Sequence, residues 1–109
     1  MILDFDTIAE KVLPNFYGGE KELVAKLFTD EQNKILIGKL VPGASIGQHT
    51  HETSSEIIYI LSGEGSVLTE SGTQKIGAGK CHYCPKGKNH SLINDSKADL
   101  IFFAVVPQQ

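Results

Sequence analysis

Two histidines separated by one residue, His49 and His51, constrain this chain more than any other feature of its sequence. In an extended strand, side chains two positions apart point to the same face of the sheet, which would place both imidazoles on one face. Two neutral imidazoles close together form half of a transition-metal site. The sequence therefore predicts a β-strand that presents metal ligands on one face.

Glu56 and His90 are candidates for the remaining ligands. Glu56 follows His51 at an odd offset, which would place it on the opposite face of an unbroken strand. The polar run from Glu52 to Ser55 offers a turn or bulge that brings Glu56 back to the common face. His90 lies in a separate segment, GKCHYCPKGKNHSLIN, so the cluster would join two parts of the chain.

These residues stand at fixed spacings within two motifs. The motifs read Gly43-x5-His49-x-His51-x4-Glu56-x6-Gly63 and Gly79-x5-Pro85-x-Gly87-x2-His90-x3-Asn94. Position for position they resemble the two motifs of the cupin superfamily, except that Lys80 stands where an acidic residue often follows the first glycine of the second motif. The resemblance implies one cupin domain over residues 1–109, with motif one at 43–63 and motif two at 79–94. It also implies that the metal ligands are His49, His51, Glu56 and His90.

Short runs rich in β-branched and aromatic residues recur along the rest of the chain, with turn residues about every ten positions. This pattern predicts an all-β fold, either a sandwich or a barrel. The resemblance selects the double-stranded β-helix, which is the jelly-roll barrel of the cupins. Residues 4–13 are the exception, because Ile8, Val12 and Leu13 would form one apolar face and Pro14 would end the segment. We therefore predict a short N-terminal helix there.

Composition limits the partners and the compartment. A net charge of −3 gives no attraction to nucleic acid or to an anionic membrane, and no apolar run approaches the roughly 20 residues of a membrane span. The acidic N-terminus is unlike a secretory signal, and two cysteines are too few for a disulfide-built fold, so we predict a cytoplasmic protein. Cupins commonly pair their N-terminal strands with a second subunit, which implies a homodimer.

The candidate ligands also indicate the kind of cofactor. Three neutral imidazoles and one carboxylate suit one divalent ion of Mn, Fe, Co, Ni, Cu or Zn, and they do not select among them. Four protein ligands leave one or two positions open in a five- or six-coordinate site, as metal-assisted chemistry on a small molecule requires. All ten basic residues are lysines. Because arginine is the preferred bidentate partner of a carboxylate, this argues against a substrate gripped by a carboxylate clamp, as in the oxalate-handling cupins.

Several apolar residues are candidates for the walls of a substrate pocket. Ile58 and Ile60 share strand parity with Glu56, so they should lie beside the metal and make the pocket largely apolar. Phe102 or Phe103 could add an aromatic wall, and parity does not distinguish between them.

Cys81 and Tyr83 share one face of another predicted strand. If that face points into the barrel, Cys81 would line the pocket and the Tyr83 phenol would reach a metal-bound substrate, as a catalytic tyrosine does in some cupin lyases. A core aromatic with a satisfied hydroxyl is an equally good interpretation of Tyr83. Cys81 and Cys84 read as two small apolar residues, because no second pair completes a zinc site. We interpret His82 as a packing or surface residue.

Two classes of function follow from this reasoning. In the first, the protein is a metal-dependent enzyme of dioxygenase, isomerase, lyase or decarboxylase type that acts on a small organic substrate. In the second, it is a non-catalytic module with a bound metal that binds or senses a small molecule or sugar. A general acid or base such as Tyr83, Cys81 or Lys39 near the metal would favour the enzyme. A pocket of Ile, Leu and Phe alone would favour binding or dioxygen chemistry.

Overall fold

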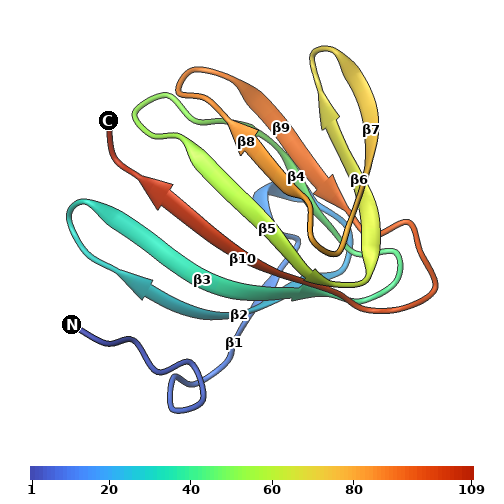
Figure 1. Cartoon of the computed structure of the whole chain (residues 1–109). Helices are drawn as coiled ribbons and strands as arrows, with labels where there is room; N and C mark the ends of the chain where they lie inside the picture. Colours follow the sequence, from blue (N-terminus) through green and yellow to red (C-terminus); the bar gives the residue numbers. More distant parts are fainter.

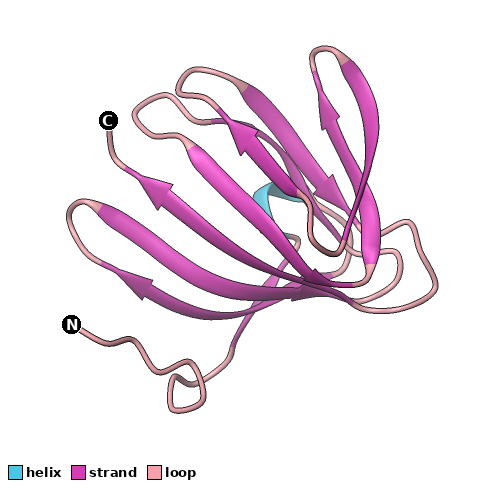
Figure 2. Cartoon of the chain, viewed as in Figure 1, coloured by secondary structure: helices cyan, strands magenta, loops and turns pink.

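The computed structural model describes residues 1–109, and almost all of its regular structure is strand (Figure 2). The strands are β1 (Lys11–Pro14), β2 (Glu22–Thr29), β3 (Asn33–Leu40), β4 (Ser45–Thr50), β5 (Glu56–Ser62), β6 (Glu64–Thr69), β7 (Gly72–Gly77), β8 (Cys81–Cys84), β9 (Asn89–Ile93) and β10 (Leu100–Pro107). One 3-10 turn, η1 (Phe16–Gly18), lies between β1 and β2. The predicted all-β fold is confirmed. The structure contains no helix long and apolar enough to cross a bilayer.

The predicted N-terminal helix is wrong. Residues 1–10 form a turn and irregular chain, and Lys11–Pro14 forms β1, which pairs antiparallel with β2. An isolated helix of about three turns is marginal in water because its first turn is costly to nucleate. As a strand, the same segment satisfies its backbone on the edge of β2, and Leu13 packs against the core.

Two antiparallel sheets face each other (Figure 1). One has the strand order β1-β2-β3-β10-β5-β8 and the other β4-β9-β6-β7. The sheets converge at one end and splay apart at the other, where the β2–β3 turn, the β4–β5 loop and the C-terminus lie. This is the predicted jelly-roll arrangement, and its open end holds the candidate site.

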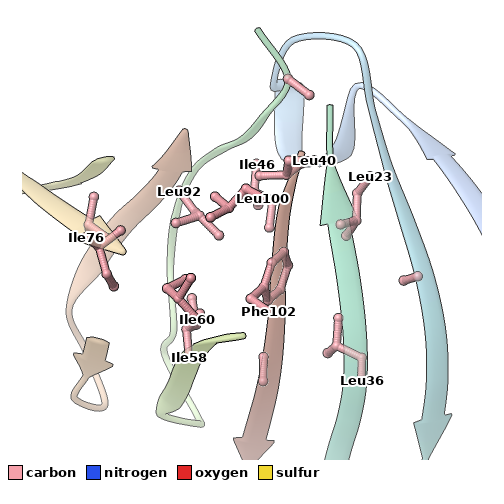
Figure 3. Packing of buried hydrophobic residues seen from close by; sticks show 14 residues of the cluster. Leu23, Leu36, Leu40, Ile46, Ile58, Ile60, Ile76, Leu92, Leu100 and Phe102 are labelled. Carbon is pink, nitrogen blue, oxygen red and sulfur yellow. The ribbon is translucent and has the colours of Figure 1, made fainter. Parts of the chain in front are cut away.

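Alternating side chains build the core between the sheets. In β5, Ile58 and Ile60 are buried, whereas Ile57 and Tyr59 between them are exposed. Figure 3 shows Ile58, Ile60 and Phe102 pointing into the shared interior. The Phe102 ring lies over Gly38 of β3, where an added Cβ would come within 2.4 Å of a ring carbon. A side chain at position 38 would therefore displace the largest aromatic ring of the core.

Candidate metal centre

The four side chains predicted as ligands converge at the open end of the barrel. His49 lies near the end of β4, His51 directly follows β4, Glu56 begins β5, and His90 is the second residue of β9. The β4–β9 register places His49 directly opposite His90. One nitrogen from each histidine and one oxygen from Glu56 all lie within 4.8 Å of one another.

Local irregularities turn these side chains to a common face. Between Ile46 and His49 the pairing of β4 with β9 shifts by one residue, so both face the interior although they are three positions apart. The chain then leaves the ladder at His51 and makes bends before β5 begins at Glu56. These bends correct the odd offset between His51 and Glu56, as the polar run predicted.

The ligand atoms have the spacing of an octahedral site. Five of the six separations among the three Nε2 atoms and Glu56 Oε1 are 2.9–3.1 Å. The sixth, between His49 Nε2 and Glu56 Oε1, is 3.9 Å. With bonds of about 2.1 Å, ligand atoms at right angles lie about 3.0 Å apart, opposite ones about 4.2 Å, and tetrahedral pairs about 3.4 Å. The five short separations are closer to the octahedral value than to the tetrahedral one, so these four groups could hold a six-coordinate ion and would leave two of its positions free.

The second ring nitrogen of each histidine is held by a polar neighbour. These contacts are His49 Nδ1 with Gly47 O at 2.7 Å, His51 Nδ1 with Ser54 Oγ at 3.1 Å, and His90 Nδ1 with His82 Nε2 at 3.0 Å. A carbonyl oxygen only accepts, so His49 Nδ1 carries the proton and its Nε2 lone pair faces the cluster. Such partners fix the tautomer and the orientation of a metal-binding imidazole.

Glu56 is ionised at the centre of this cluster. Burial raises the pKa of its carboxyl, but the polar ring nitrogens of His49, His51 and His90 around it outweigh burial and hold the pKa well below its ordinary value. A carboxylate that stays charged at neutral pH is the form that binds a metal ion.

His82 belongs to this network, although we interpreted it as a packing or surface residue. Burial lowers the pKa of His82 first and its neighbour His90 lowers it further, only partly countered by Glu56, so His82 is neutral and can accept the proton of His90 Nδ1. Cys84 lies near both rings, and burial followed by the charge of Glu56 raises the pKa of its thiol. His82 pairs with Ile58 of β5, whose side chain faces the interior, so the His82 side chain faces the interior as well. The sequence alone does not show this pairing.

A cavity of about 350 Å³ adjoins the cluster and is bounded by His49, His51 and Glu56. Its wall is mostly apolar, and of the two candidate aromatic residues Phe102 borders it and Phe103 does not. Ile58 and Ile60 are buried in the core but do not border the cavity.

The prediction that Cys81 and Tyr83 line the pocket is wrong. Both side chains are exposed, Tyr83 at 56%, and neither borders the cavity. Tyr83 pairs with Ile57, which lies on the outer surface of the six-stranded sheet. Strand parity had correctly placed Cys81 and Tyr83 on one face, but that face points away from the candidate metal, so the Tyr83 phenol cannot reach it.

A different tyrosine lies at the cluster. The Tyr17 ring stacks on the His49 imidazole, with centroids 4.1 Å apart and planes 11° from parallel, and it borders the cavity. Its backbone approaches Gly47 so closely that a Cβ there would lie 1.9 Å from the Tyr17 carbonyl oxygen. Tyr17 also has a left-handed backbone, with φ of 52°. No motif in the sequence marks this residue.

Comparison with known proteins gives a consistent result. A family model described as "Cupin domain" matches residues 36–106. An oxalate-binding protein of Thermotoga maritima is 36% identical over 112 aligned positions, covering 97% of this chain and 93% of that protein. The crystal structure of a "predicted oxalate decarboxylase" from Thermotoga maritima superposes over the whole of both chains, with a TM-score of 0.93 and 30% identity. A cupin-superfamily sugar phosphate isomerase from Silicibacter pomeroyi, 19% identical, shares the fold, with a TM-score of 0.82 over all of this chain and 76% of that one.

Proposed function

The chain belongs to the cupin domain family, and from that premise we propose that it binds one divalent transition-metal ion and, through it, a small carboxylic acid. His49, His51, Glu56 and His90 would hold the ion. The observation that carries the proposal is the octahedral spacing of their four ligand atoms beside a cavity. When bound, the metal would act as a Lewis acid toward carboxylate or carbonyl oxygens.

A carboxylic acid is the ligand class with the most support. One relative is named an oxalate-binding protein, and carboxylate oxygens are suitable ligands for the two open positions. The chain has no arginine to clamp a carboxylate. A carboxylate held by the metal needs none, so the composition is compatible with this ligand class.

Turnover of the bound acid is the second candidate function. Two adjacent open positions support decarboxylase or dioxygenase chemistry, in which the metal does most of the work. Isomerase and lyase reactions have less support, because they need a protein acid or base and Tyr83 lies outside the cavity. The Tyr17 phenol is the remaining candidate for such a group near the cluster.

The test is elemental analysis of protein purified without a metal-binding tag, followed by calorimetric titration with oxalate and other small acids. We expect about one equivalent of metal, and His51→Ala should lose most of it. A matched change of an exposed polar residue, Gln74→Ala on β7, should retain it. Protein that holds no metal, and takes up none when soaked with the candidate divalent ions, would overturn the proposal.

We further propose a homodimer formed through one surface of the six-stranded sheet. Its outer apolar face consists of side chains that are 41–56% exposed: Ile57, Tyr59, Leu61 and Tyr83. Contiguous apolar surface of this kind commonly marks an interface, and a second copy would cover it symmetrically. The two cysteines are free, which supports a reducing compartment, and we place the protein in the cytoplasm.

A further inference from the structure

The cavity extends from the metal cluster into the apolar interior of the barrel. Five of its lining residues are buried in the core: Leu23 and Ala25 of β2, Leu36 of β3, Ile46 of β4 and Phe102 of β10. Figure 3 shows Leu23, Leu36 and Phe102 pointing inward from neighbouring strands. The space beside the candidate metal is therefore walled by hydrocarbon on the side of the six-stranded sheet.

The polar groups of the cavity are confined to two places. One group surrounds the cluster itself: Tyr17, His49, His51, Ser54 and Glu56. The other belongs to the β2–β3 turn, its flanks and the C-terminus: Thr29, Asp30, Asn33, Lys34 and Gln108. Lys34 is the one lysine that lines the cavity, and Asp30 also lines it. The apolar part of the wall, between these two polar groups, offers no hydrogen-bond donor to a second carboxylate beside the metal.

The separation of the polar groups from the apolar wall limits which ligands the cavity favours. Oxalate is two joined carboxylates with no apolar part, so at the metal it would leave the hydrocarbon wall facing water or a charged group, which is unfavourable. An acid with one carboxylate and an apolar body would place the carboxylate at the metal and bury the body against Ala25, Leu36 and Phe102. Small-molecule sites commonly combine a few polar groups with a predominantly apolar wall in this way.

Building on the proposed function, we infer that the site selects a monocarboxylic 2-oxo or 2-hydroxy acid with an aryl or branched-alkyl side chain. The carboxylate and the neighbouring oxygen of such an acid can occupy two adjacent open positions about 3 Å apart. The apolar side chain fills the cavity. Specificity then comes from the wall on β2, β3 and β10, while the head group is held by the ion.

The experiment compares three 2-oxo acids, which share one head group, with oxalate, on protein first shown to contain one equivalent of Ni²⁺. Pyruvate, 4-methyl-2-oxopentanoate, phenylpyruvate and oxalate are titrated calorimetrically. We expect 4-methyl-2-oxopentanoate or phenylpyruvate to bind at least about tenfold more tightly than pyruvate, because burial of an apolar side chain favours binding. Oxalate should bind more weakly than the better of these two acids.

Cavity-filling variants test the wall directly. Ala25→Leu should reduce the affinity for the larger acids about tenfold, and should leave the Ni²⁺ content and the affinity for pyruvate unchanged. Leu27→Phe, at a partly buried position of the same wall, serves if Ala25→Leu does not fold. Val24→Leu is the matched control, because Val24 is the neighbouring residue of β2 and does not border this cavity.

Three results would overturn the inference: oxalate or pyruvate binding as tightly as the larger acids, no binding of any acid by Ni²⁺-loaded protein, or affinities that folded Ala25→Leu and Leu27→Phe both leave unchanged. Failure to take up Ni²⁺ or another divalent ion is a different result, because it would overturn the proposed function itself. The metal content measured before each titration separates the two cases.

Discussion

The Nε2 atom of His82 lies 3.0 Å from Nδ1 of His90, so a histidine of the metal cluster is held from behind by a second histidine. Because His82 is neutral, His90 can donate its Nδ1 proton and keep its Nε2 lone pair toward the cluster. The contact joins β8, at the edge of the six-stranded sheet, to β9 in the other sheet. His82, which is not a motif position, therefore orients His90, which is one.

Removal of this contact should weaken metal binding. His82→Ala is expected to lower the affinity about 10- to 100-fold, as loss of a partner behind a ligating histidine typically does. The affinity can be measured by competition with a chromophoric chelator. His82→Gln, whose amide oxygen can accept the same proton, should recover part of the loss. Equal affinities in His82→Ala and the unaltered protein would show that another contact orients His90.

The stacked pair of Tyr17 and His49 should respond to loss of the ring rather than of the hydroxyl. Tyr17→Ala is expected to lower the free energy of unfolding by about 1 kcal/mol and to weaken metal binding, because His49 loses its stacking partner. Tyr17→Phe keeps the ring and should retain both. Urea unfolding and chelator competition measure the two effects. A Phe variant as impaired as the Ala variant would assign the role to the phenol oxygen.

Gly38→Ala should destabilise the fold, because the added methyl would meet the Phe102 ring. The expected cost is about 1–3 kcal/mol in the free energy of unfolding, the range for overpacking a core. Combination with Phe102→Leu tests the cause. If the clash is responsible, the double variant loses less stability than the two single variants added together, and strict additivity would argue against it.

Acid should weaken the link between Asp95 and the β6–β7 hairpin. Hydrogen bonds from Ser66, at 2.6 Å, and then from Lys75, at 2.9 Å, hold the pKa of Asp95 below its ordinary value. Since the folded-state pKa is the lower one, the link stabilises the fold at a pH above the ordinary aspartate pKa. That stabilisation is lost as the pH falls through the folded-state pKa.

Asp95→Asn provides the measurement. In urea unfolding of metal-free protein, the variant should be less stable than the unaltered chain at pH 7, and the two should converge under acid. Ser66→Ala removes the larger of the two causes and should act in the same direction. A stability difference that persists unchanged into acid would show that the charge of Asp95 is not responsible.

The outer apolar face can be tested by placing charge within it. Tyr83→Lys and Leu61→Glu should each convert a dimer to a monomer, because a charge buried in an apolar interface without a partner is costly. Light scattering coupled to size-exclusion chromatography measures the mass. Gln74→Lys, on exposed β7 of the other sheet, should leave it unchanged. A monomeric unaltered protein would contradict the proposal directly.

The sequence was sufficient for the fold class and for the convergence of the four candidate ligands. Strand parity brings His49 and His51 to one face, and the polar run before Glu56 signals the correction that this residue needs. His90 follows from the second motif. These features depend on local chain geometry, which can be inferred from the spacing of residues along the sequence.

Other features depend on how strands pair and pack against one another, which cannot be inferred from the spacing of residues along the sequence. Parity showed that Cys81 and Tyr83 share a face, but only the pairing of β8 with β5 shows that this face is external. The position of Tyr17 requires the close approach of its backbone to Gly47 in β4. The segment predicted as a helix became β1 because β2 offered it an edge, and no pattern within residues 4–13 contains that information.

The histidines of the cluster lie on or beside β4 and β9, whereas the buried apolar residues of the cavity wall, apart from Ile46, belong to β2, β3 and β10. Substitutions at Ala25 or Leu36 can therefore reshape the cavity while the metal ligands stay in place. Over evolutionary time, such a barrel can exchange one small molecule for another through a few changes in one sheet. Its descendants would share a metal site and differ in what they bind.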